Sequence, residues 1–137
     1  MRVDYTCVYG MSRNLNFPVC TQGNQLTAMY DGMTIVTAPG LGGRTFWFVV
    51  WKLDKQYTYP AVPKYSKEEC HAVCEEYKDY EVAPGFTFGS LWSTCYAYSM
   101  AALEESVFEH WAYERIVCIG DSMHKVEPRF NHERLRC

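Results

Sequence analysis

The strongest pattern in the chain is a pair of apolar, β-type runs on either side of a glycine-rich turn. Residues 33–38 (MTIVTA) are largely β-branched, and residues 44–51 (RTFWFVVW) form the most apolar run. Between them, residues 39–43 contain three glycines, which tolerate the positive φ values of tight turns. The two runs are therefore predicted to be neighbouring antiparallel strands. Residues 5–9 alternate with period two and predict another strand with one covered face.

The clearest helical segment follows at residues 66–80. Ser66 and Glu69 have the spacing of a capping box, which starts a helix by satisfying its first free N–H groups. Apolar positions then recur at helical spacing at Cys70, Val73, Cys74 and Tyr77. This single apolar face predicts a helix that packs against the sheet.

Three weaker patterns complete the expected elements. Thr87 or Ser90 opens a second predicted helix, and residues 101–110 predict a third. Residues 115–119 form a short apolar run that predicts a buried strand ending just before Gly120. Together the patterns predict an α+β fold in which helices cover an antiparallel sheet.

Length and charge narrow the classes of function. With 137 residues, the chain suits one domain or a piece of a larger one. Its formal net charge of −3 argues against nucleic acid as the main partner, because phosphate binding needs a basic excess. The longest apolar run, residues 46–51, is too short to cross a bilayer. The N-terminus has no signal-peptide pattern, so we expect an intracellular, non-secreted protein whose seven cysteines are reduced.

One cysteine pair has the close spacing of metal ligands. Cys70 and Cys74, with His71 between them, could contribute soft ligands to zinc. However, the two cysteines lie one helical turn apart on the apolar face, and no second ligand pair completes a tetrahedral site. Core packing is therefore the favoured interpretation, and we expect no metal.

The end of the run at residues 115–119 is a candidate ligand site. Gly120 and Asp121 follow a predicted strand, and ligands of open α/β sheets bind beyond the carboxyl ends of strands. Glycine lets a ligand approach the backbone, and a carboxylate accepts hydrogen bonds from ribose or polyol hydroxyls. Taken alone, the same pattern also fits a plain Gly-Asp turn, and the residues themselves leave both readings open.

The surrounding motif resembles a known family. Residues 119–125 (IGDSMHK) are similar to the second flavin-binding motif of FAD-dependent monooxygenases of the aromatic-hydroxylase type. The fungal members that act in indole-diterpene and meroterpenoid biosynthesis are resembled by four stretches, GGRTFWFVVWKLDKQYTYP, VPKYSKEE, FTFGSLW and FEHWAYERIVCIGDSMHKVEP. The resemblance extends over residues 5–128, which is nearly the whole chain.

The resemblance implies a division of the chain and a set of ligands. Residues 1–115 would form a substrate domain of antiparallel sheet and helices, residues 116–128 the strand and flavin motif, and residues 129–137 an unpatterned tail. Asp121 would hydrogen-bond the ribityl chain of FAD, with Gly120 giving backbone clearance. NAD(P)H would be the reductant, and the substrate an apolar polycyclic terpenoid that is epoxidised or hydroxylated.

The chain departs from this family at both ends. It has no G-x-G-x-x-G segment, so no complete Rossmann unit is expected, and no glycine-rich helix start follows Pro128. A truncated gene, a split subunit and a wrong reading frame all fit this pattern. Any membrane association would come from segments absent here. The competing functional hypothesis is a non-catalytic remnant or a small ligand-binding module.

Aromatic residues supply the remaining candidates. Tyr30, just before the strand at 33–38, is a candidate catalytic residue by resemblance, and the alternative is a turn tyrosine packed on its neighbours. Along residues 44–51, Phe46 and Phe48 share one strand face while Trp47 and Trp51 share the other. One face could line a pocket for an apolar substrate while the other meets the helices, or both could be core.

Overall fold

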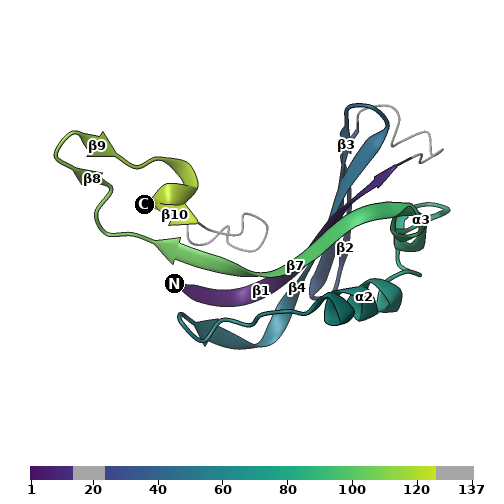
Figure 1. The fold of residues 1–137 in the computed structure, drawn as a ribbon, viewed down its shortest axis with the longest axis horizontal. Coiled ribbons are helices and arrows are strands. Elements are labelled where there is room, and N and C mark those ends of the chain that lie inside the picture. Colours follow the sequence, from purple (N-terminus) through teal and green to yellow (C-terminus); the bar gives the residue numbers. More distant parts are fainter. Residues whose placement is uncertain (14–23, 126–137) are drawn as a thin grey trace.

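The protein is built around one curved antiparallel sheet (Figure 1). The computed structural model describes residues 1–13 and 24–125. Within them, six strands are arranged in the order β10-β7-β1-β4-β3-β2. Their bounds are β1 Arg2–Arg13, β2 Leu26–Tyr30, β3 Met33–Gly40, β4 Arg44–Thr58, β7 Cys95–Val107 and β10 His124–Lys125. Most of these strands are joined to a neighbour by a long antiparallel ladder, so the sheet holds the fold together.

The hairpin predicted from residues 33–38 and 44–51 is confirmed. It forms the β3–β4 pair, with Met33 opposite Trp51 at one end and Gly40 opposite Arg44 at the other. Gly42 and Gly43 occupy the turn with φ values of 70° and 69°, which only glycine adopts without strain. The run at residues 5–9 lies inside the longer strand β1, which pairs with β4 on one side and β7 on the other.

Two helices lie between β4 and β7 along the chain. Helix α2 spans Lys67–Glu76, and its capping box is confirmed: the Glu69 amide donates to the Ser66 hydroxyl at 3.1 Å, and the Ser66 amide donates to the Glu69 carboxylate at 2.7 Å. The helix ends four residues before the predicted position 80, because the chain turns at Tyr77. The second predicted helix is α3, Phe88–Ser93, with Thr87 at its N-cap. Two short strands, β5 Glu81–Ala83 and β6 Phe86–Thr87, separate the helices.

The core lies between these helices and one face of the sheet. Trp47 is fully buried and meets Phe88 of α3 edge-on, with ring centroids 4.9 Å apart. Its indole N–H donates to the Ser12 hydroxyl at 2.9 Å, and that hydroxyl donates to the Leu91 carbonyl at 2.6 Å. Gly10 makes room for this arrangement, since a Cβ there would lie 2.3 Å from the Trp47 ring. A single tryptophan therefore ties β4, β1 and α3 together.

The helices contact one face of the sheet only. Strand residues on that face that join the core with α2 and α3 are Val8, Met33, Ile35, Trp47 and Val49. Their neighbours along each strand point to the opposite face, because side chains alternate across a strand. The expected helical cover is thus limited to one face of a fold dominated by antiparallel sheet. Within residues 5–9, Val8 faces the helices, whereas Tyr9 lies on the opposite face and is 41% exposed.

The predicted helix at residues 101–110 is wrong. Residues up to Val107 belong to strand β7, which pairs with β1 over ten positions from Arg2–Glu105 to Ser12–Cys95. The segment contains Ala, Leu and Glu, which favour helix locally. Pairing with β1 overrides that preference, and Tyr98 and Met100 pack on the core at strand spacing.

Beyond β7 the chain forms an arm that projects from the sheet (Figure 1). The arm contains the two-stranded pair β8 Ala112–Tyr113 and β9 Ile116–Val117, followed by the single turn η1 Gly120–Ser122. The buried strand expected at residues 115–119 is wrong as to burial, since Ile116 and Val117 are both 68% exposed. No other described strand pairs with β8 and β9, and the apolar side chains of β9 face outward. Among the described residues, no helix is long and apolar enough to span a membrane.

Candidate flavin-contacting segment and helix-free sheet face

The segment 119–125 is anchored to the end of β7 rather than to a parallel sheet. Strand β10 pairs with β7, with His124 opposite Val107 and Lys125 opposite Ser106. The Phe108 amide adds a hydrogen bond to the Met123 carbonyl at 2.9 Å. This pairing joins the candidate flavin motif to the same six-stranded sheet as the rest of the chain. The division expected at residue 115 is untested and stays a prediction.

Gly120 and Asp121 form an open turn. Gly120 has a φ of 63°, and no atom lies within 4 Å of the position that a Cβ would take. Ser122 closes the turn, because its hydroxyl donates to the Ile119 carbonyl at 2.7 Å and accepts from the Ile119 amide at 3.1 Å. Asp121 is exposed, and no described residue bonds its carboxylate. The turn thus presents an unengaged acceptor beside clear backbone, which fits a hydroxyl-bearing ligand such as the ribityl chain of FAD.

His124 adds a second unengaged group. Its Nδ1 is buried yet has no hydrogen-bond partner among the described residues. Its ring lies 6.5 Å from that of Trp111, at 36°. Trp111 itself is held by a hydrogen bond from its indole N–H to the Phe108 carbonyl. The motif residues therefore leave a buried nitrogen without a partner, which also fits a segment that completes its contacts with another group.

Tyr30 lies far from this segment in the sheet order. It ends β2 at one edge of the six-stranded sheet, and β10 forms the opposite edge. Its hydroxyl donates to the Glu81 carbonyl at 2.6 Å, and its ring meets Tyr80 edge-on at 4.9 Å. The structure thus does not bring Tyr30 together with Asp121, and its hydroxyl is already engaged with the backbone.

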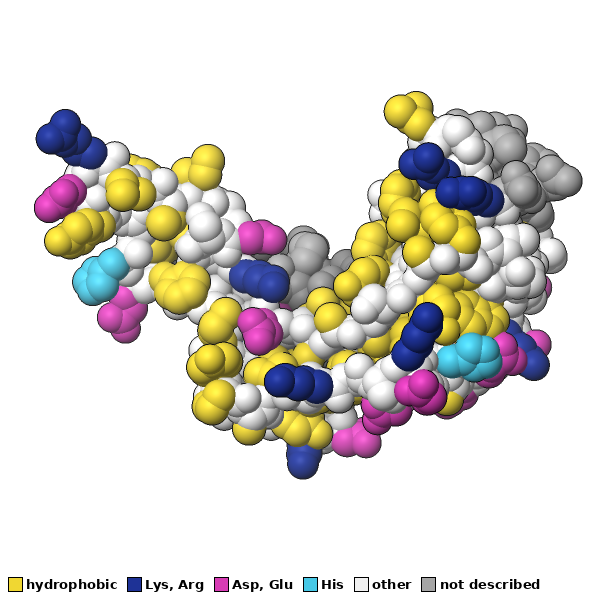
Figure 2. Space-filling view, viewed as in Figure 1, with side chains coloured by type: hydrophobic (Ala, Val, Ile, Leu, Met, Phe, Trp, Pro, Cys, Tyr) yellow, Lys and Arg dark blue, Asp and Glu magenta, His cyan; other side chains and the backbone are white. Residues whose placement is uncertain are grey.

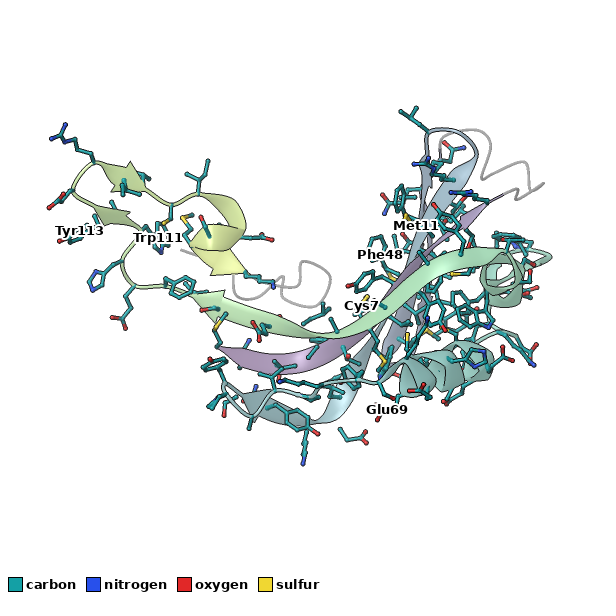
Figure 3. All side chains as sticks on the ribbon, viewed as in Figure 1. Cys7, Met11, Phe48, Glu69, Trp111 and Tyr113 are labelled. Carbon is teal, nitrogen blue, oxygen red and sulfur yellow. The ribbon has the colours of Figure 1, made fainter. Side chains whose placement is uncertain are left out.

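The helix-free face of the sheet is rich in large apolar side chains. Tyr9 and Met11 of β1 stand opposite Phe48 and Phe46 of β4, respectively. The centroids of the Tyr9 and Phe48 rings are 6.5 Å apart, and the ring planes are inclined by 29°. Tyr9 is 41% exposed and Phe48 is 38% exposed. Figure 2 shows hydrophobic side chains along the wall of the hollow between sheet and arm. In Figure 3, Met11 and Phe48 lie on the side of the sheet away from Glu69 and α2.

The two faces of β4 thus resolve the alternative left open by its sequence. Trp47 and Trp51 pack on the helices, whereas Phe46 and Phe48 are partly exposed on the other side. Sequence reasoning missed Tyr9 as a candidate residue. The sequence signal for Tyr9 was the alternation within residues 5–9. Which of the alternating side chains face the helices depends on the pairing with β4.

The cysteine pair lies in the core, as predicted. Cys70 is 2% exposed and Cys74 is fully buried, both within the contact between α2 and the sheet. Burial raises the pKa of both thiols above the usual value. No group of three or more His, Cys, Asp or Glu side chains in the described ranges could hold a metal ion. The expectation that these cysteines bind no metal remains a prediction.

Comparison with known proteins gives this arrangement a context. The FAD-dependent monooxygenase atmM of Aspergillus flavus is 45% identical to the chain over 128 residues. The chain is similar to a segment of the fungal FAD-dependent monooxygenases. The FAD-dependent monooxygenases cdmI of Talaromyces verruculosus and paxM of Penicillium paxilli are 44% and 41% identical over the same length. In all three cases the match covers 93% of this chain but 26% of the relative, so the chain spans about a quarter of these monooxygenases.

Solved structures show the same fold at lower identity. A variant of Klebsiella pneumoniae HpxO in complex with FAD matches with a TM-score of 0.62 and 17% identity, over 93% of this chain and 32% of that protein. The tetracycline destructase Tet(51) matches with a TM-score of 0.52 and 8% identity over the same shares. At these identities the likeness concerns the fold alone. No protein-family profile matches the chain.

Proposed function

We propose that the chain is part of an FAD-dependent monooxygenase that epoxidises or hydroxylates an apolar, terpenoid-type secondary metabolite. The observation that carries the proposal is the 45% identity to atmM over 128 residues, because so long a match at that level far exceeds a shared fold. In this account the chain supplies the substrate-domain sheet and one end of the cofactor site. The remaining three quarters of the relatives' length has no counterpart in this chain.

The proposed cofactor contact is at Gly120 and Asp121. The carboxylate of Asp121 would accept hydrogen bonds from ribityl hydroxyls of FAD, and the clear space beside Gly120 would let the ligand approach the backbone. His124 and Lys125 match the motif as well, and the unpartnered His124 Nδ1 is the nearer candidate for a further contact. When bound, FAD would supply the oxygen-transfer chemistry, with NAD(P)H as reductant.

The proposed substrate surface is the helix-free face of the sheet. Phe46, Phe48 and Tyr9 offer partly exposed aromatic area that an apolar polycyclic molecule can cover. Burial of such area is favourable by roughly 25 cal/mol per Å², so a ligand of this kind gains affinity without specific polar contacts. Tyr30 remains a proposed catalytic residue by resemblance, although its bond to Glu81 favours a structural role.

A second candidate function is a ligand-binding module without catalysis. The observation that favours it is the partly exposed aromatic surface of Tyr9, Phe46 and Phe48 on the helix-free face. That face would then bind an apolar ligand without the help of a cofactor.

A chimera separates the two candidates. In it, this chain replaces the matching segment of atmM, and it is compared with the 137-residue chain alone. The monooxygenase proposal expects the chimera to retain stoichiometric FAD and NADPH to bleach the flavin absorbance, while the chain alone retains little FAD. A folded chimera that carries no flavin would contradict the proposal and leave the ligand-binding module standing.

A further inference from the structure

Two tyrosines of the sheet differ in what their hydroxyl groups do. The Tyr30 hydroxyl is bonded to the Glu81 carbonyl at 2.6 Å, so it is not free for a ligand. Tyr9 lies near the middle of β1 on the helix-free face, and no described residue bonds its hydroxyl. With 41% of its surface exposed, Tyr9 presents that hydroxyl to whatever covers the face.

The surroundings of Tyr9 limit what that ligand can be. Its cross-strand neighbours are Phe48 on β4 and Ser99 on β7. The next positions of the same face on β1 are Cys7 and Met11, which are uncharged. Charged side chains begin only at the ends of the patch, with the cross-strand pair Arg13 and Arg44 at one end and Lys52 at the other. A charged ligand would lose hydration at the centre of this face without meeting an opposite charge. An uncharged apolar ligand has no such desolvation cost when it covers the face.

The side chains around the Tyr9 and Phe48 rings are mostly small. They are Ala97, Ser99 and Ala101 on β7 and Val36 and Ala38 on β3. Tyr96 of β7 is the exception: it is 42% exposed, and its hydroxyl contacts the Met11 sulfur at 3.6 Å. The Tyr96 hydroxyl is therefore engaged, in contrast to that of Tyr9.

We infer that Tyr9 is a specificity-determining residue of the helix-free face: its hydroxyl selects uncharged, apolar ligands that carry a hydrogen-bond acceptor within its reach. The inference rests on the proposed function, in which this face binds the apolar substrate. It assigns the polar contact with that substrate to Tyr9 rather than Tyr30. A hydroxyl desolvated without a partner costs free energy, so a ligand that lacks the acceptor is disfavoured.

The test uses two probes of the same shape. Fluorenone and fluorene are planar three-ring molecules that differ by one carbonyl acceptor. Their dissociation constants are measured by fluorescence titration against the 137-residue chain and its variants. Tyr9→Phe, which removes only the hydroxyl, is expected to weaken fluorenone about two- to tenfold and to leave fluorene within about twofold. Tyr113→Phe, which removes the hydroxyl of a tyrosine on the arm that is 75% exposed, is the matched control and is expected to change neither probe.

Further variants separate this inference from the proposed function. Phe48→Ala is expected to weaken both probes, because it removes aromatic area from the face, whereas Ile116→Ser on the arm is expected to leave both unchanged. If the probes bind and respond to Phe48→Ala but Tyr9→Phe leaves their ratio unchanged, the role of Tyr9 is refuted and the apolar face stands. If neither probe binds the folded wild-type chain, both the face and the role of Tyr9 are refuted.

Discussion

Burial sets the chemistry of the core cysteines. Desolvation raises the pKa of Cys74 far above its usual value, and the neighbouring Cys70 adds to that effect. Because the thiolate is the reactive form, both thiols should be inert in the folded protein. They lie between helix and sheet, and their side chains serve packing there.

Thiol labelling tests this packing role. At pH 8, Cys70 and Cys74 should react with a water-soluble disulfide reagent more than about tenfold more slowly than the partly exposed Cys118. Peptide mapping by mass spectrometry assigns each labelled site, and labelling in denaturant provides the control in which all thiols react. Stoichiometric zinc in the purified protein, lost on Cys74→Ser, would overturn the assignment of these residues to the core.

The capping box of α2 links one residue to the pH dependence of stability. The hydrogen bonds from the Ser66 backbone and side chain hold the pKa of Glu69 below its usual value of 4.5. A lowered pKa in the folded state means that the ionised form stabilises the fold above that usual value. This contribution is lost as the pH falls through the folded pKa, because the carboxylate is then protonated in both states.

Ser66→Ala should therefore destabilise the protein in a pH-dependent way. At pH 7 the loss of the cap is expected to cost about 0.5–2 kcal/mol of the free energy of unfolding, measured by urea denaturation. Part of this cost should disappear as the pH falls through the folded pKa of Glu69, because the bond with the Ser66 side chain is one cause of the lowered pKa. Glu68→Gln, in the same turn but outside the capping box, is the control. A cost for Ser66→Ala that stayed constant down to acid pH would contradict the coupling to Glu69.

At the scale of elements, strand β4 has one buried face and one partly exposed face. Trp47→Ala should cost about 3–5 kcal/mol, since the side chain is fully buried and bonded to Ser12. Phe46→Ala, one residue away on the helix-free face, should cost under about 1.5 kcal/mol, because the side chain remains partly in contact with water. Comparable losses for the two variants in urea denaturation would mean that both faces are covered.

Elements with strong local signals were predictable from the sequence. The β3–β4 hairpin has β-branched runs around its glycines, and α2 has a capping box with an apolar face, so local chemistry and tertiary contacts agree there. In β7 they disagree, because helix-forming residues such as Ala102 and Leu103 are held extended by their pairing with β1. The pattern within residues 101–110 gives no information about this long-range pairing, so the strand could not be predicted from it.

The candidate site also has a part that could be predicted from the sequence and a part that could not. The Gly120–Asp121 turn is a local motif and could be located from the sequence. Tyr9 gains its place only through the register between β1 and β4, which sets it opposite Phe48. The exposure of Ile116 and Val117 also could not be predicted, because an apolar run indicates burial but does not specify the tertiary contacts that would bury it.

At the scale of the whole molecule, the arm and the helix-free face both expose apolar surface. The arm exposes Trp111, Tyr113, Ile116, Val117 and Ile119, and the sheet exposes Phe46 and Phe48. Such surface is unusual in a protein that acts alone. It fits a chain that spans 26% of the length of relatives such as atmM, in which the remaining length is available to cover it.

The central claim is that this chain contributes a flavin contact at Asp121, and FAD affinity tests it most directly. The dissociation constant of FAD is measured by flavin fluorescence for the atmM chimera that carries this chain and for its Asp121→Ala variant, with Glu109→Ala on the arm as the control. We expect Asp121→Ala to weaken FAD about ten- to a hundredfold, as the loss of a hydrogen bond to a charged group predicts, and Glu109→Ala to have little effect. Equal FAD affinity in the chimera and its Asp121→Ala variant would contradict the claim.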